Sequence, residues 1–104
     1  MNDFELDLGL GTPAPNKEMA RLREMLDEAG IKWHDASSGS FCRTQGPSKD
    51  DKQWQFSAVC GPHAYGEIEL WTQTMRDAKP YALDPIGLDT AEEAFALIRA
   101  EVDG

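Results

Sequence analysis

The feature that most constrains the fold is the stretch of residues 54–72, WQFSAVCGPHAYGEIELWT, whose pattern predicts two strands joined by a short loop. Successive side chains of a strand point to opposite faces of a sheet. One face of the first strand is apolar and comprises Trp54, Phe56, Ala58 and Cys60. On the second strand an apolar set opposes an acidic set that includes a tryptophan: Ile68, Leu70 and Thr72 against Glu67, Glu69 and Trp71. The alternation predicts an antiparallel pair with one face in the core.

Two amphipathic segments flank these strands. After Asn16, apolar residues recur at spacings of three and four, which is helical periodicity: Met19, Leu22, Met25, Leu26 and Ala29. Asn16 is the expected N-cap of this helix, and Gly30 is the expected residue after its end. Thr90-Ala91-Glu92-Glu93 is a capping box. A second apolar stripe begins there and predicts a second helix: Ala91, Ala94, Phe95, Ile98 and Val102.

The segments between these elements complete the predicted topology. Residues 31–35 and 40–44 each alternate as short strands, with Ile31 and Trp33 inward. Pro80 and Pro85 exclude a long element within residues 73–88, where residues 74–78 suit a helical turn. We therefore predict an α+β fold, in the order α-β-β-β-β-α, with an antiparallel sheet of three to four strands. Both helices pack on one face, and the other face stays partly open.

The first 15 residues are predicted to form an acidic arm and linker ahead of a single domain at residues 16–104. Within residues 1–11, Phe4, Leu6, Leu8 and Leu10 alternate with acidic residues, as in a strand. Three interpretations remain open, namely an edge strand of the sheet, an arm that docks on a partner by strand addition, or a loosely held terminus.

The net charge of −9, from 10 basic and 19 acidic residues, excludes several classes of function. Residues 84–104 alone carry −5, because six acidic residues stand against Arg99. Such a surface repels nucleic acids and anionic membranes, and it suits a protein partner with a basic surface. No apolar run approaches the roughly 18 residues of a membrane span. The acidic N-terminus lacks the basic start of a signal peptide, so we expect a cytoplasmic protein.

The residues whose side chains are best suited to catalysis or metal binding are Cys42, Cys60, His34 and His63. Cys60 and His63 have a C-x-x-H spacing that zinc can use, but zinc sites usually have two such pairs. Cys60 also shares a strand face with apolar residues, which favours a buried thiol. A nucleophilic Cys60 with His63 as its base would need an electropositive pocket, and the flanking residues are apolar or acidic. We therefore predict no catalytic residue, no metal ligand and no cofactor.

Several short motifs together resemble a group of small prophage-encoded proteins from Gram-positive hosts. The motifs are Glu28-Ala29-Gly30-Ile31, Val59-Cys60, His63-Ala64-Tyr65-Gly66, Ile68 to Trp71, and Leu88 to Ile98. In that group a short helix ends in an Ala-Gly-Ile-like step, a cysteine-containing strand enters a Tyr-Gly turn, and a Leu-Thr-x-Glu-Glu helix closes the chain. The similarity covers roughly residues 17–104 and is weakest at residues 73–87. It implies a mobile genetic element as the source and carries no activity or catalytic residue.

These observations favour a non-enzymatic acidic module of phage or prophage origin that binds a protein. One form is an inhibitor of a nucleic-acid-binding defence complex, resembling an anti-CRISPR protein, whose carboxylates take the place of phosphates. The expected partner-binding residues are Glu67, Glu69, Trp71, Asp89, Glu92 and Glu93. An alternative is a regulator of phage replication or assembly that acts through the open sheet face or the N-terminal arm. A third is a small zinc or thiol protein that uses Cys60 and His63.

Overall fold

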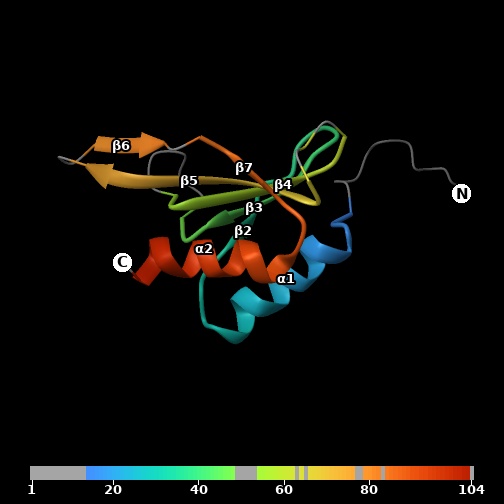
Figure 1. Cartoon of the computed structure of the whole chain (residues 1–104), viewed down its shortest axis with the longest axis horizontal. Helices are drawn as coiled ribbons and strands as arrows, with labels where there is room; N and C mark the ends of the chain where they lie inside the picture. Colours follow the sequence, from blue (N-terminus) through green and yellow to red (C-terminus); the bar gives the residue numbers. More distant parts are fainter. Residues whose placement is uncertain are drawn as a thin grey trace, which may run out of the picture.

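The computed structural model describes residues 14–48, 54–62, 64, 66–76, 79–82 and 84–103, and within them it is an α+β fold (Figure 1). Of the predicted arm and linker at residues 1–15, residues 1–13 lie outside this part of the chain. The elements, in chain order, are α1 (Lys17–Glu28), β2 (His34–Asp35), β3 (Cys42–Gly46), β4 (Phe56–Cys60), β5 (Ile68–Arg76), β6 (Lys79–Ala82), β7 (Ile86–Leu88) and α2 (Ala91–Asp103).

All neighbouring strands pair antiparallel, in the order β2-β3-β4-β5-β6, and β7 also pairs with β5. β7 lies along residues 68–70 of β5, and β6 lies along residues 73–76. The two short strands thus follow each other along one edge, and the described sheet is five strands wide. The prediction of three to four strands missed this edge.

The helical turn predicted at residues 74–78 is wrong, because β5 continues to Arg76 and β6 begins at Lys79. Pro80 does not prevent this pairing, since β6 is an edge strand and proline lacks only an outward amide hydrogen. The two other short strands differ at their ends from the prediction. β2 is limited to His34–Asp35, and β3 extends to Gly46.

Both predicted helices and their caps are confirmed. The Asn16 side chain accepts a hydrogen bond of 2.8 Å from the Met19 amide, and Gly30 follows the helix at a φ of 73°. At α2, the Thr90 hydroxyl accepts from the Glu93 amide at 3.2 Å, and the Glu93 carboxylate accepts from the Thr90 amide at 3.3 Å.

The two helices lie side by side on one face of the sheet, as predicted (Figure 1). Their buried side chains pack against the apolar side of the central strands to form one core: Met19, Leu22, Leu26, Ala91, Ala94, Ile98, Phe56, Ala58, Cys60, Ile68 and Leu70. Burial of one Leu or Ile side chain stabilises a fold by about 1.5–3 kcal/mol. The core therefore accounts for the attachment of both helices to a single face.

Trp54 is not on the core face, in contrast to the prediction. The Gln55 amide donates to the Gly46 carbonyl at 2.8 Å, while Phe56 is the register partner of the same Gly46. Two residues opposite one form a β-bulge, which interrupts the alternation of side chains. The side-chain amide of Gln55 donates a hydrogen bond of 3.3 Å to the Glu101 carbonyl oxygen of α2. Gln55 and Phe56 thus both face the helices, and Trp54 turns to the other side.

Candidate functional site

The six predicted partner-binding residues do not form one surface. Glu69 and Trp71 alternate with the buried Ile68 and Leu70, so they lie on the sheet face opposite the helices, which we call the outer face. Glu92 and Glu93 are in the first turn of α2, in the helix layer. Glu67 and Asp89 come near each other at the start of β5, where the Glu67 amide donates to the Leu88 carbonyl at 2.8 Å.

The carboxylates of α2 already have partners within the chain. Glu92 forms an exposed ion pair of 2.8 Å with Arg21, and this hydrogen bond lowers the pKa of Glu92. Glu93 accepts from the amides of both Thr90 and Asp89, at 3.3 and 3.2 Å. The acidic start of α2 therefore has a structural role. By contrast, the Glu69 carboxylate has no polar partner among the described residues.

Two rows of side chains cross the outer face. The register places Gln45, Ser57 and Trp71 in one row across β3, β4 and β5. Arg43, Val59 and Glu69 form the next row. Trp71 is 37% exposed, whereas Gln45 and Ser57 are buried at 2% and 4%. The outer face thus combines a partly exposed indole with a buried polar floor.

A hollow of about 190 Å³ lies on the outer face. We call it the tryptophan hollow. It is lined by Arg43, Gln45, Trp54, Ser57 and Trp71. Sites for drug-sized ligands usually measure about 300–1,000 Å³, so this hollow suits a single protruding side chain better. Alternation on β5 identified Trp71 as an outward residue. Trp54 was missed because the bulge reverses its face.

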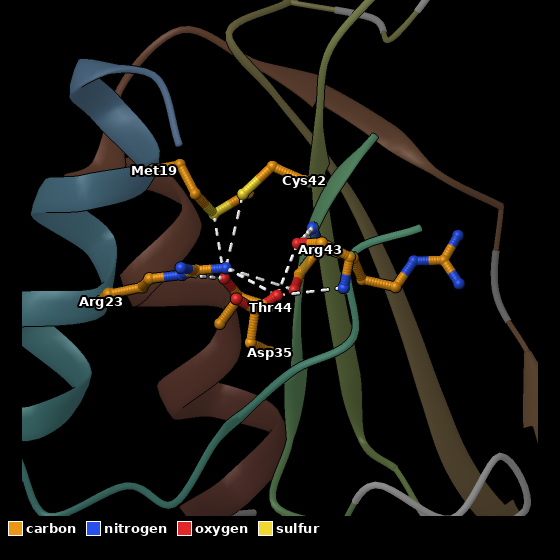
Figure 2. A network of polar contacts seen from close by, with 7 residues as sticks. Met19, Arg23, Asp35, Cys42, Arg43 and Thr44 are labelled. Atoms are coloured by element: carbon orange, nitrogen blue, oxygen red, sulfur yellow. Dashed lines mark hydrogen bonds and ion pairs between the residues drawn. The ribbon is translucent and has the colours of Figure 1, made fainter. Parts of the chain in front are cut away.

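Arg23 of α1 makes a partly buried polar network on the other side of the sheet (Figure 2). Its side chain is only 14% exposed. Its Nε donates to Thr44 Oγ1 at 2.7 Å, and its Nη2 donates to Cys42 Sγ at 3.4 Å and to the Arg43 carbonyl at 3.3 Å. Nη2 also lies 3.5 Å from the Asp35 carboxylate. The network joins α1 to β3 through a charged group with several acceptors.

Two further contacts position the network. The guanidinium lies 4.8 Å from the centre of the Trp33 ring, a cation–π arrangement. The Asp35 carboxylate accepts from the Ser37 hydroxyl and amide, and these bonds, with a smaller effect of Arg23, lower the pKa of Asp35. Arg23 lies outside the apolar stripe of α1, so helical periodicity alone indicates a solvent-facing position. No sequence signal showed that β3 would approach it there.

Cys42 and Cys60 are direct register partners on β3 and β4, and both are free thiols, 1% and 3% exposed. The expectation that Cys60 is a buried core thiol is confirmed. Burial raises the pKa of Cys60, and the neighbouring Cys42 adds to the effect. The thiolate that a nucleophile needs is accordingly scarce near neutral pH.

The proposed partner of Cys60, His63, lies outside the described residues. His34 is engaged elsewhere, with Nε2 3.1 Å from the Pro47 carbonyl oxygen. Among the residues that the structure describes, no group of three or more His, Cys, Asp or Glu is arranged to hold a metal ion.

Comparison of the chain with protein-family models, with curated proteins and with solved structures found no match. Neither of the described helices has the length and apolar character required to cross a membrane.

Proposed function

We propose that the chain is a non-enzymatic module that binds a protein partner on its outer face. The tryptophan hollow is the observation that carries this proposal. Tryptophan and arginine are the side chains most enriched among residues that dominate binding energy, and here Trp54, Trp71 and Arg43 line one hollow. The volume of about 190 Å³ suits one inserted side chain, with the two indoles as its apolar walls.

The partner that fits is a protein surface with a protruding apolar side chain beside basic residues. Glu69 lies in the row next to Trp71, and the exposed Glu67 lies two residues earlier, just before β5 begins. Neither carboxylate has a partner among the described residues, so both can pair with lysine or arginine. The net charge of −9 would further accelerate encounter with a basic surface.

Alanine variants of Trp71 and Trp54 test the proposal, with Leu97→Ala as a matched control. Leu97 is 38% exposed, nearly the same as Trp71, but it lies on α2 in the helix layer. The tagged full chain retrieves candidate partners from a bacterial lysate, and titration calorimetry with each purified candidate measures Kd. Loss of an aromatic anchor should weaken binding by roughly 30-fold or more, and Leu97→Ala should leave Kd unchanged. Equal affinities for all four proteins would contradict the proposal.

A second candidate function is inhibition of a nucleic-acid-binding defence complex in the cytoplasm of a bacterial host. The observation in its favour is acidity on the helix layer, where Glu24 and Glu28 flank the Arg21–Glu92 pair and carry exposed carboxylates. These groups would occupy positions of phosphates, and the resemblance to prophage proteins supports such a target. This mechanism predicts competition with DNA or RNA and binding that weakens steeply with salt.

The double variant Glu24→Gln/Glu28→Gln separates the two candidates. It removes two charges from the helix layer and leaves the tryptophan hollow intact. Under the mimicry mechanism, binding at low salt falls in this variant and persists in Trp71→Ala. Under the outer-face mechanism, binding falls in Trp71→Ala and persists in the double variant.

A further inference from the structure

The two cysteines are positioned to be joined. Directly opposed residues of an antiparallel pair have Cα atoms about 4.5–5.5 Å apart, with their side chains on the same face. A disulfide needs Cα atoms about 4.4–6.8 Å apart. Cys42 and Cys60 are such a pair, and both side chains lie on the core face. The bond between them would need little movement of either strand.

The two cysteines differ in their position relative to a hollow of a size that admits a small oxidant. Cys60 lines a hollow of about 420 Å³ near the start of α1, together with Ala14, Asn16, Ser40, Gly61, Pro62, Gly66 and Glu67. A water molecule takes about 30 Å³ in the liquid, so a molecule of two oxygen atoms fits readily. Cys42 is absent from this lining. Cys60 therefore borders the hollow while it is only 3% exposed, and Cys42, at 1%, is the more sheltered cysteine.

The sheltered sulfur lies beside a fixed positive charge. Arg23 Nη2 is 3.4 Å from Cys42 Sγ and is held there by Asp35 and the Arg43 carbonyl (Figure 2). This contact holds the Cys42 sulfur in place beside its register partner Cys60. Cys42 thus has the surroundings of a resolving cysteine, which attacks a sulfur that has already been oxidised.

We propose that Cys60 and Cys42 form a peroxide-sensitive dithiol that closes to an intrachain disulfide. Burial keeps the Cys60 thiolate a minor species near neutral pH, so the first step is slow. In that step Cys60 releases its proton, and its thiolate attacks one oxygen of hydrogen peroxide. The O–O bond breaks, and the departing hydroxide takes up a proton to become water. The product is a Cys60 sulfenic acid. The Cys42 thiolate then attacks the Cys60 sulfur, the S–O bond breaks, and hydroxide leaves as a second water. Two thiols and one peroxide give one disulfide and two waters, and a dithiol reductant reverses the change.

Intact-mass spectrometry of the purified full chain tests the proposal directly. After treatment with hydrogen peroxide the monomer should lose two hydrogen atoms and should no longer take up iodoacetamide in denaturant. Dithiothreitol should restore both alkylation sites. Retention of two free thiols, addition of oxygen without loss of hydrogen, or a disulfide between two chains would each overturn it.

Two serine variants test the order of the steps. In Cys42→Ser the sulfenic acid of Cys60 has no resolving thiol, so dimedone should trap it as one adduct on the folded chain. In Cys60→Ser the remaining thiol lies away from the hollow and should stay unmodified until the chain is unfolded in urea. Trapping at equal rates in the two folded variants would contradict the assigned roles. Circular dichroism confirms that each variant is folded, and the wild-type mass measurement is independent of both variants.

Discussion

Arg23 Nε donates to Thr44 Oγ1 across 2.7 Å, and this bond connects the middle of α1 to the centre of β3. The Thr44 hydroxyl is itself fully buried and donates to Met19 Sδ at 3.3 Å, one helical turn away from Arg23. The result is a chain of polar contacts inside the layer that joins helix and sheet (Figure 2). Removal of the arginine leaves the buried Thr44 hydroxyl without its donor, which is costlier than the loss of one exposed bond.

Arg23→Ala should therefore destabilise the fold by about 2–4 kcal/mol, measured by urea unfolding. Arg21→Ala is the matched control, because Arg21 also lies on α1 and pairs with a carboxylate, but its side chain is 53% exposed. An exposed ion pair contributes only about 0–1 kcal/mol. Equal losses in the two variants would show that the Arg23 network does not hold α1 to the sheet.

Gly46→Ala tests the β-bulge at the start of β4. A β-carbon at this position would collide with the Lys32 carbonyl oxygen and with the Phe56 ring at 2.8 Å. Backbone and a buried ring cannot both move away cheaply, so the variant should lose about 1–3 kcal/mol or more in urea unfolding. Gly30→Ala is the comparison, since nothing lies within 4 Å of a β-carbon there and only the positive φ opposes it. That conformational cost is about 1–2 kcal/mol. A Gly46→Ala protein as stable as wild type would argue against the bulge.

Asp35 makes stability depend on pH in the acidic range. Its pKa is lowered in the folded chain, first by the Ser37 hydroxyl and less by Arg23. A carboxyl whose folded pKa lies below its unfolded value of about 3.9 contributes stability that is present above that value. The contribution is lost as pH falls through the folded pKa. The stability difference between wild type and Asp35→Asn should thus be largest near pH 6 and shrink below pH 4, in urea unfolding at each pH. Ser37→Ala should reduce the same difference, and a constant gap across this range would contradict the assignment.

The parts of the fold that the sequence predicted are those encoded by local contacts. Asn16 caps α1 and Thr90 caps α2 through bonds to residues three positions away, so short motifs suffice to locate both helices. The core face of β5 follows from its alternation. By contrast, Arg23 is partly covered by a strand about 20 residues further along the chain, and helical periodicity does not show which strand covers which turn.

The candidate site was predicted only in part for the same reason. Trp71 lies in an unbroken strand, so its outward direction followed from its position. Trp54 precedes a bulge that is formed with Gly46 of the neighbouring strand. Alternation counted back from Phe56 therefore does not give the sheet face on which Trp54 lies. The sequence predicted a capping box that ends at Glu93, and it also predicted that Glu92 and Glu93 bind a partner. Their bonds to Arg21 and Thr90 confirm the structural role.

The placement of Trp54 outside the core gives a final prediction about two neighbouring aromatic residues. Phe56 is fully buried, and Phe56→Ala should destabilise the fold by about 3–5 kcal/mol, because a large apolar side chain leaves a cavity. Trp54 is half-buried in the wall of a surface hollow, so Trp54→Ala should cost clearly less, about 1–2 kcal/mol, since solvent can enter the vacated space. Urea unfolding of both variants measures the difference. If Trp54 shared the core face with Phe56, as strict alternation predicts, the two losses would be similar, and the bulge and the outer-face hollow would both be wrong.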